Sequence, residues 1–300
     1  MAKEAKKNIA ESVKARLLNY SRKNSIEYNS VLLQYAQERF LYRISKSKYA
    51  ENFILKGALL FRAYGISRFR PTRDIDFLGQ SVTNDIHIIK TIIKEISKLR
   101  FDDGLSFDPE SISVEEIKEQ DLMHGIRVKL LSVLGTVRQR IQLDIGFGDT
   151  IYPEAVDIDY PTLLDFEAPH LKVYTIDSAV AEKFEAIVSL GIATSRMKDF
   201  YDISFFASNH KFELRSLHNA LRETFSNRNT NIENRKYIFS HTYREDDTLQ
   251  KSWGSFLKKH LLQSEYNFSE IVGRIQLFIE PACTSVDMNA YWLHREWKWK

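Results

Sequence analysis

Two aspartates separated by one residue form the pattern with the clearest chemical meaning, in the run Arg-Asp-Ile-Asp-Phe at residues 73–77. On a β-strand, side chains two apart point to the same face, so Asp74 and Asp76 would project together. Their apolar neighbours Ile75 and Phe77 would then face a core. Two adjacent carboxylates repel each other, and a hard divalent cation bound through oxygen removes that repulsion. The pair alone is more typical of a solvated edge strand with two charges, because the pattern is so short.

A second predicted strand, at residues 141–147, changes this balance. Its apolar residues alternate with polar ones, so Asp144 lies on the opposite face from the core. If this strand pairs with residues 73–78, three carboxylates meet on one face of a sheet. Three aspartates on two strands suit two-metal phosphoryl chemistry, in which metals hold the attacking and leaving oxygens. Asp149 could lie at the rim of such a site or be an ordinary turn residue.

A glycine turn, Lys56-Gly57-Ala58, precedes a short predicted helix at residues 59–64. Free backbone N–H groups and the helix dipole can hold a phosphate there, although any strand-to-helix turn can contain one glycine. Four arginines follow this turn: Arg62, Arg68, Arg70 and Arg73. Their planar guanidinium groups suit phosphate contacts, and they equally suit a solvated loop, so both interpretations stay open.

The C-terminal half contributes two further carboxylates, Asp199 and Asp202, three residues apart on a helix rich in aromatic residues. Such a helix is largely buried, and buried carboxylates need partners. The candidate partners are Lys183, Arg196 and Lys198. Lys183 falls at the edge of the apolar stripe of a helix that Asp177 or Ser178 can cap. These charges would form either a salt-bridge network that joins the two halves of the chain or part of a site.

The elements that must position these residues indicate an α+β fold, with a small mixed sheet flanked by helices and a helical C-terminal half. Helical spacing of apolar residues predicts N-terminal helices over 1–50 and an amphipathic helix over 85–99. A core sheet is expected over 51–175, with an irregular segment at 149–168. The remainder, 176–300, reads as helical and would complete the cleft.

Composition excludes several classes of protein and of site. The chain of 300 residues has a formal net charge of +3 and one cysteine, Cys283, which excludes an internal disulfide and a multi-cysteine zinc site. No apolar run approaches the roughly 18 residues of a membrane span, so we expect a cytoplasmic protein without a membrane partner. The tail at 291–300 mixes aromatic and basic residues, which suits stacking on RNA bases but more commonly reflects packing onto the domain.

Six segments, in order, carry a family resemblance: LKGALLFRAYG, RPTRDIDFLG, QLDIGFGD, YPTLLDF, AEKFEAIVSLG and SRMKDFYDI. They resemble the AbiEii/AbiGii toxin family of nucleotidyltransferases over about residues 12–212. The resemblance implies a DNA-polymerase-β-like nucleotidyltransferase fold and the toxin of a type IV toxin–antitoxin or phage-defence pair. It also implies Mg²⁺, a nucleoside triphosphate, an RNA acceptor such as the 3′ end of tRNA, and an antitoxin encoded nearby.

Matched by motif, the resemblance places the triphosphate at Gly57-Ala58 and the metal on Asp74 and Asp76. It assigns Lys183 to the family's lysine motif, and Lys198, Asp199 and Asp202 to its last motif. The wider superfamily has Gly-Ser at the turn, so Ala58 lacks a hydroxyl that would contact phosphate. Asp144 as a third metal ligand rests on strand parity and on analogy with the superfamily.

The complete hypothesis is a Mg²⁺-dependent nucleotidyltransferase. Its catalytic residues would be Asp74, Asp76, Lys183 and Asp199, and its metal ligands Asp74, Asp76 and Asp144. Its nucleotide contacts would be Lys56, Gly57, Ala58, Arg62, Arg73, Lys183, Lys198 and Asp202. Two alternatives remain: a related module that binds RNA or a protein without catalysis, which Ala58 favours, and transfer of the nucleotide to a protein hydroxyl.

Overall fold

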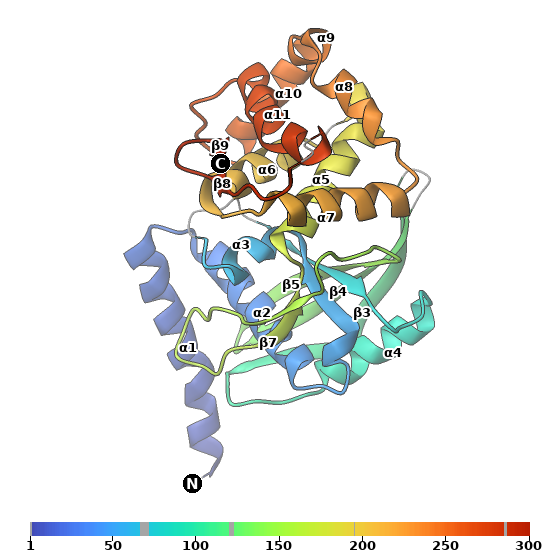
Figure 1. The fold of residues 1–300 in the computed structure, drawn as a ribbon. Coiled ribbons are helices and arrows are strands. Elements are labelled where there is room, and N and C mark those ends of the chain that lie inside the picture. Colours follow the sequence, from blue (N-terminus) through green and yellow to red (C-terminus); the bar gives the residue numbers. More distant parts are fainter. Residues whose placement is uncertain (1, 67–71, 120–122, 195, 285–286) are drawn as a thin grey trace. The chain divides into compact units, whose positions relative to one another are not determined.

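The computed structural model describes residues 2–66, 72–119, 123–194, 196–284 and 287–300 (Figure 1). The chain divides into two compact units. The first comprises Met1–Gly148 and Val156–Val173, and the second comprises Asp149–Ala155 and Tyr174–Lys300. The short segment Asp149–Ala155 therefore belongs to the second unit, although the chain on either side of it belongs to the first.

Within the described residues, the first unit contains a seven-stranded sheet with the order β3-β4-β5-β2-β1-β7-β6. The strands are β1 (Phe53–Lys56), β2 (Asp74–Gly79), β3 (Leu105–Glu119), β4 (Met123–Leu134), β5 (Val137–Phe147), β6 (Val156–Asp159) and β7 (His170–Val173). Strands β2 and β5 pair in parallel, as do β1 and β7, whereas the other pairs are antiparallel. The predicted mixed sheet is confirmed.

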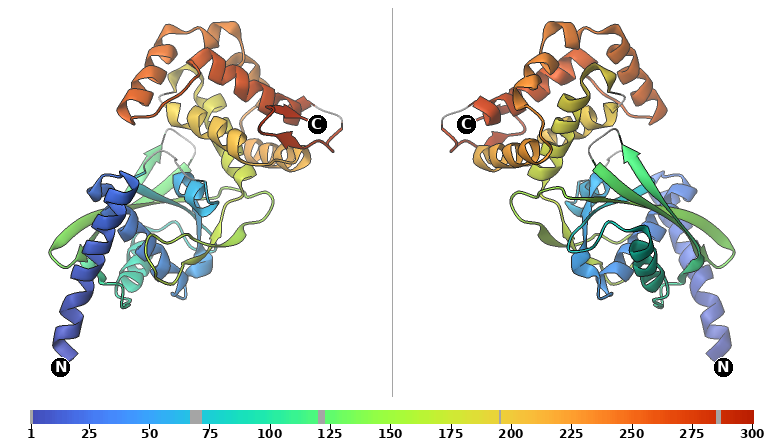
Figure 2. Two further views of the ribbon diagram at one scale, coloured as in Figure 1. Left: turned by 90° about the vertical axis from the view of Figure 1, so that its left-hand side faces the viewer. Right: turned by 90° about the vertical axis from the view of Figure 1, so that its right-hand side faces the viewer.

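Helices α2 (Tyr28–Ser45) and α4 (Ile86–Ser97) cover the apolar face of this sheet. Helix α1 (Ala2–Asn24) packs on α2, and the short α3 (Leu60–Ala63) follows β1 along the chain. Helix α2 packs on β5 and β7, and α4 packs on β3 and β4. The residues beneath them are fully buried, including Ile75, Phe77, Leu143 and Ile145. The alternation predicted for β2 and β5 is therefore confirmed: one face of each strand forms core, and the other is left for polar side chains. The N-terminal end of α1 projects beyond the sheet (Figure 2).

Two strands lie where the sequence predicted none. Strand β6 falls inside the segment 149–168, which we expected to be irregular, and β7 is the next strand along the chain. They pair with each other, Ile158 opposite Leu171, and Leu55 on β1 pairs with Val173. Each strand has only four residues, too few for alternation to be distinguished from a loop, and pairing within the sheet supplies the missing stability.

The second unit is helical, as predicted. Its helices are α5 (Ile176–Leu190), α6 (Met197–Asn209), α7 (Leu214–Asn227), α8 (Arg235–Ile238), α9 (His241–Arg244), α10 (Asp247–Lys259) and α11 (Phe268–Thr284). Helix α5 packs on α6 and α7, and α11 packs on the same two helices. The predicted cap of α5 is wrong: Thr175 caps it, and its hydroxyl accepts a hydrogen bond from the Ser178 N–H at 3.3 Å. The extended backbone of Thr175 places its oxygen at the first turn, whereas Asp177 and Ser178 are already helical.

The aromatic tail forms a small ribbon, β8 (Trp292–Leu293) with β9 (Lys298–Trp299), inside the second unit. Trp292 is 1% exposed and packs against Phe278, Trp297 and Trp299. Its indole N–H donates to the carbonyl of Ala207 at 2.7 Å. The interpretation of the tail as aromatic packing is confirmed. Among the described residues, no helix is long and apolar enough to cross a membrane.

Candidate active site

The polar face of the first unit's sheet brings four charged residues into one row. Asp76 on β2 lies opposite Asp144 on β5, and Lys56 on β1 lies opposite Asp76 on its other side. Arg127 on β4 lies opposite Asp144. Directly paired residues share a face of the sheet, so the row runs Lys56, Asp76, Asp144, Arg127. Asp74 stands on the same face, two residues before Asp76. The expected convergence of three carboxylates on two paired strands is confirmed.

Gly57 closes this row at the end of β1. Its φ is +71°, a backbone conformation that other residues rarely adopt. A Cβ atom there would lie 2.6 Å from Asp76 Cγ and closer still to Oδ2. Only glycine lets the main chain come so near the carboxylate. The turn after β1 is therefore held directly against the carboxylate of Asp76.

Arg127 is a residue of this row that the sequence did not single out. Its Nε donates to Asp144 Oδ1 and its Nη2 to Asp144 Oδ2, both at 2.8 Å, which makes a bidentate pair. The hydrogen bonds to Asp144 raise the pKa of Arg127. Gln142 donates to the same two oxygens at 3.2 and 3.3 Å. Arg127 alternates with buried Ile126 and Val128, and this parity was its only signal in the sequence.

The donor set fits a divalent cation of the hard type. Asp74 and Asp76 present carboxylate oxygens from one strand face, both half-buried, and Mg²⁺ is commonly held by one or two carboxylates together with substrate phosphates. In the described part of the chain, no group of three His, Cys, Asp or Glu side chains is arranged to hold a metal ion by itself. A cation here would therefore share its coordination with the ligand.

The remaining predicted contacts of the first unit are placed as follows. Ala58 is buried, so only its main chain can face a ligand. It lies inside a three-residue 3₁₀ turn, Gly57–Leu59, which leads into the single turn of α3. The helix dipole invoked for this turn is consequently small. Arg73 is exposed at the start of β2. Arg68 and Arg70 lie outside the described residues.

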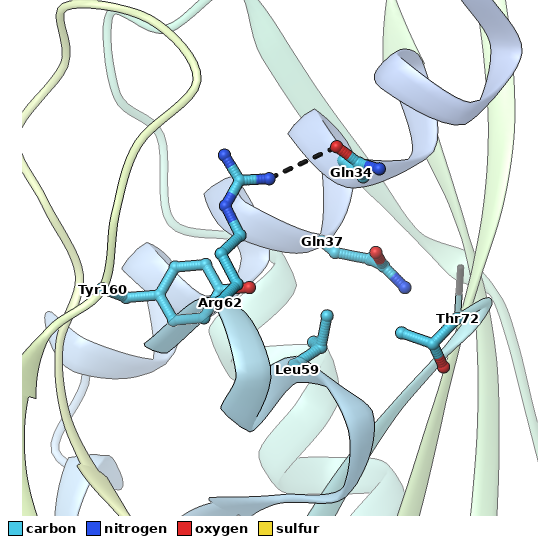
Figure 3. A pocket seen from close by; sticks show the side chains of 6 residues that line it. All are labelled: Gln34, Gln37, Leu59, Arg62, Thr72 and Tyr160. Carbon is cyan, nitrogen blue, oxygen red and sulfur yellow. Dashed lines mark hydrogen bonds between the residues drawn. The ribbon is translucent and has the colours of Figure 1, made fainter. Parts of the chain in front are cut away.

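Arg62 lies in a small pocket lined by Gln34, Gln37, Leu59, Thr72 and Tyr160 (Figure 3). Its Nη1 donates to Gln34 Oε1 at 3.3 Å, and its guanidinium stands 6.0 Å from the centre of the Tyr160 ring. Gln37 donates to the carbonyl of Arg73 at 3.0 Å, which ties α2 to the start of β2. The pocket places one arginine next to the segment that carries the aspartates.

The second unit holds the predicted carboxylate network. Lys183 on α5 donates to Asp199 Oδ1 at 3.2 Å and to Asp202 Oδ2 at 2.8 Å, both on α6. Arg196 Nε lies 2.8 Å from Asp199 Oδ2. The side chains of Asp199 and Asp202 are at most 1% exposed, whereas Lys183 keeps 12%. The expected pairing of Lys183 with the two carboxylates is confirmed, and it joins α5 to α6 within the second unit.

Lys198, also predicted to contact the nucleotide, is exposed in the first turn of α6. A second network, which the sequence did not indicate, surrounds Arg228. Its guanidinium donates to Asp149 Oδ1 and Glu185 Oε2, each at 2.7 Å, and lies 3.7 Å from Glu182 Oε2. Burial acts to lower the pKa of Arg228, but the carboxylates of Glu182 and Asp149 outweigh it and raise the pKa. Asp149 is thus an anchor within the second unit.

A mixed sheet with paired aspartates on β2, a glycine turn beside them and covering helices defines a nucleotidyltransferase-like fold. Residues 39–274 match the family described as nucleotidyl transferase AbiEii toxin of type IV toxin–antitoxin systems. The match spans well over half of the chain, which therefore belongs to this family. No curated protein sequence matches the chain.

Two solved structures from Helicobacter pylori resemble the chain. One is described as a candidate nucleotidyltransferase, with a TM-score of 0.50 at 13% identity over 86% of this chain and 96% of that one. The other is JHP933, with a TM-score of 0.48 at 15% identity over 83% of this chain and 90% of that one. At such low identity the first likeness supports the fold alone.

Proposed function

We propose that this chain transfers a nucleotide from a nucleoside triphosphate to a hydroxyl of an acceptor, with a divalent cation held by Asp74 and Asp76. One observation carries the proposal. The carboxylate of Asp76 lies against the main chain at Gly57, and Asp76 is paired with Asp144 across β2 and β5. Membership of the AbiEii family of nucleotidyl transferase toxins supports the same reaction class.

In this reaction the acceptor oxygen forms a bond to the α-phosphorus, the bond to the leaving diphosphate breaks, and the acceptor proton passes to solvent. A Mg²⁺ ion bound by Asp74 and Asp76 would screen the charge that develops on the phosphate. The turn at Gly57 and Ala58 offers backbone N–H groups to the phosphates, and Lys56 adds a positive charge beside them. Catalysis then consists of positioning and electrostatic stabilisation on a rigid sheet.

For the second unit, we propose that Lys183 contacts the triphosphate and that Asp199 orients the lysine. What supports this role is the motif match together with the 12% exposure of Lys183, whose carboxylate partners are buried. Asp202 fixes the ammonium from the other side. Exposed Lys198 would contact the acceptor or the phosphates from the surface of α6.

The proposed acceptor is RNA, with the 3′ end of tRNA as the first candidate, and the proposed partner is a cognate antitoxin. The family description, a toxin of type IV toxin–antitoxin systems, supports the partner. A net charge of +3 is compatible with a polyanionic acceptor. A protein hydroxyl is the other acceptor class, and the labelled species separates the two.

The test is to incubate the full chain with each of four α-labelled nucleoside triphosphates, Mg²⁺ and total tRNA, and to resolve RNA from protein. We expect label on RNA, at least about 100-fold less with Asp76→Asn, and none when the cation is chelated. Asp157→Asn is the matched control, because Asp157 is exposed on β6 and pairs only loosely with Lys172, at 3.4 Å. Equal labelling by Asp76→Asn and Asp157→Asn would exclude the proposed site.

A second candidate function is nucleotide or RNA binding without transfer, and the buried methyl of Ala58 favours it. RNA labelling and nucleotide retention by the parent chain separate the two candidates. A transferase that manages without this hydroxyl should label RNA in the parent form. A binding module should retain nucleotide, measured by equilibrium dialysis, with no label transferred by the parent chain.

A further inference from the structure

The carboxylate of Asp144 is fully engaged by protein donors. A carboxylate offers about four lone-pair sites. Arg127 occupies one on each oxygen at 2.8 Å, and Gln142 approaches the same two oxygens at 3.2 and 3.3 Å. A metal ion could reach Asp144 only by displacing one of these donors, and the bidentate arginine pair is the harder one to displace.

Arg127 also stands among other carboxylates of the polar sheet face. Besides its pair with Asp144, it lies close enough to Asp74 and Glu115 to be stabilised electrostatically by both. Its side chain keeps 33% exposure, so the guanidinium is shielded but reachable. The guanidinium neutralises the charge of Asp144, as a bound metal ion would neutralise the charges of Asp74 and Asp76. In both cases the repulsion between neighbouring carboxylates is removed.

We infer that Arg127 takes the place of a second divalent cation, withholding Asp144 from metal coordination so that the chain without nucleotide binds a single divalent ion. This inference rests on the proposed function in one respect, namely that Asp74 and Asp76 hold the ion. Arg127 is accordingly a positioning residue, and Asp144 is its anchor and not a metal ligand. The three-aspartate arrangement predicted from the sequence then operates as two ligands and one ion pair.

The experiment counts Mn²⁺ bound to the full chain without nucleotide, from the loss of the free Mn²⁺ electron paramagnetic resonance signal. The parent should bind one ion, and Asp144→Asn should leave the affinity within about threefold. Arg127→Met should bind a second ion, or bind the first at least about tenfold more tightly, because three carboxylates then face one another. The double variant Arg127→Met/Asp144→Asn should lose this gain.

Lys129→Met is the matched control, since Lys129 lies two residues along β4 on the same face and pairs with Glu115 at 2.7 Å. It removes the same charge and should change the affinity by less than about threefold. A purely structural role for Arg127 would lower Mn²⁺ binding and not raise it. Should Arg127→Met fail to fold, Arg127→Lys keeps the charge but loses the bidentate geometry, and should show a smaller gain of the same sign.

An unchanged isotherm for Arg127→Met, an equal gain in Lys129→Met, or two ions of similar affinity in the parent would each overturn the inference. Its failure is distinguishable from that of the proposed function. If no acceptor is labelled but Arg127→Met gains an ion, the transfer reaction is wrong and the inference stands. If RNA is labelled but Arg127→Met gains nothing, the reverse holds.

Discussion

The main chain at Gly57 lies directly against the carboxylate of Asp76, so close that no side chain fits between them. The contact follows from register: Lys56, the residue before Gly57, pairs with Asp76 across β1 and β2. The chain must then turn sharply at a positive φ of 71° to leave the sheet. A turn residue and a candidate metal ligand are in this way held in one rigid arrangement.

Gly57→Ala should therefore abolish nucleotide transfer while Asp74 and Asp76 are both intact. The added methyl would displace the Asp76 carboxylate, and the positive φ adds strain of about 1–2 kcal/mol. Gly65→Ala is a matched control, because Gly65 has a φ of 69° and nothing within 4 Å of an added Cβ. Urea unfolding and RNA labelling of both variants measure strain and function separately. Comparable labelling by the two variants would show that the contact with Asp76 is unimportant.

Lys183→Met should destabilise the second unit by about 3–5 kcal/mol, because it leaves the buried carboxylates of Asp199 and Asp202 without their shared cation. Adding Asp202→Asn should restore at least about 1 kcal/mol, since the pair is coupled. Lys198→Met, an exposed neighbour on α6, should change the stability by less than about 0.5 kcal/mol. Chemical denaturation measures all three. A loss of activity in Lys183→Met without loss of stability would favour the triphosphate contact over the structural role.

Glu38 should make the first unit less stable as the pH rises. Burial raises the pKa of Glu38 from 4.5 to about 7, although the Leu163 N–H donates to its Oε2 at 2.6 Å. Between these two pKa values the folded state binds more protons than the unfolded state, so the free energy of unfolding falls with rising pH. This fall in the free energy of unfolding is nearly complete above pH 7.

Glu38→Gln should remove this dependence and gain about 2–3 kcal/mol relative to the parent between pH 5 and pH 8. Denaturation curves at each pH provide the measurement. Glu51→Gln serves as the control because the Glu51 side chain is 76% exposed. A parallel pH dependence for the parent and Glu38→Gln would show that another group is responsible.

Trp292→Ala should cost about 3–5 kcal/mol of stability in the second unit, because it empties the centre of an aromatic cluster and orphans the carbonyl of Ala207. Tyr291→Ala, one residue earlier and 58% exposed, should cost less than about 0.5 kcal/mol. Thermal unfolding compares the two variants. Equal melting temperatures would mean that the tail contributes nothing to the fold.

Local patterns predicted much of this architecture. The alternation in residues 73–78 and 141–147 correctly assigned Ile75 and Leu143 to the core and Asp144 to the polar face. The amphipathic helix expected over 85–99 appears as α4, with Asp85 accepting from the N–H groups of its first turn. Patterns with several repeats succeed because each repeat adds to the same preference, whereas the four residues of β6 carry too little signal.

The site was predicted in part, for a related reason. Strand parity gives the face on which a side chain lies, so Asp74, Asp76 and Asp144 were placed together once their strands paired. It does not give the neighbour across the next strand, and Arg127 was missed for that reason. Arg228 was missed because its partner Asp149 comes from a loop 79 residues earlier in the chain.

The sequence by itself determined which residues are polar on which strand and helix faces, because periodicity is a local property of the chain. Only the tertiary structure decided which charges meet. The register of β5 with β4 and β2 gave Asp144 an arginine on one side and an aspartate on the other. The packing of α5 on α6 gave Lys183 two carboxylates. Register and packing depend on the whole core, and so the pair of aspartates acquired its surroundings only on folding.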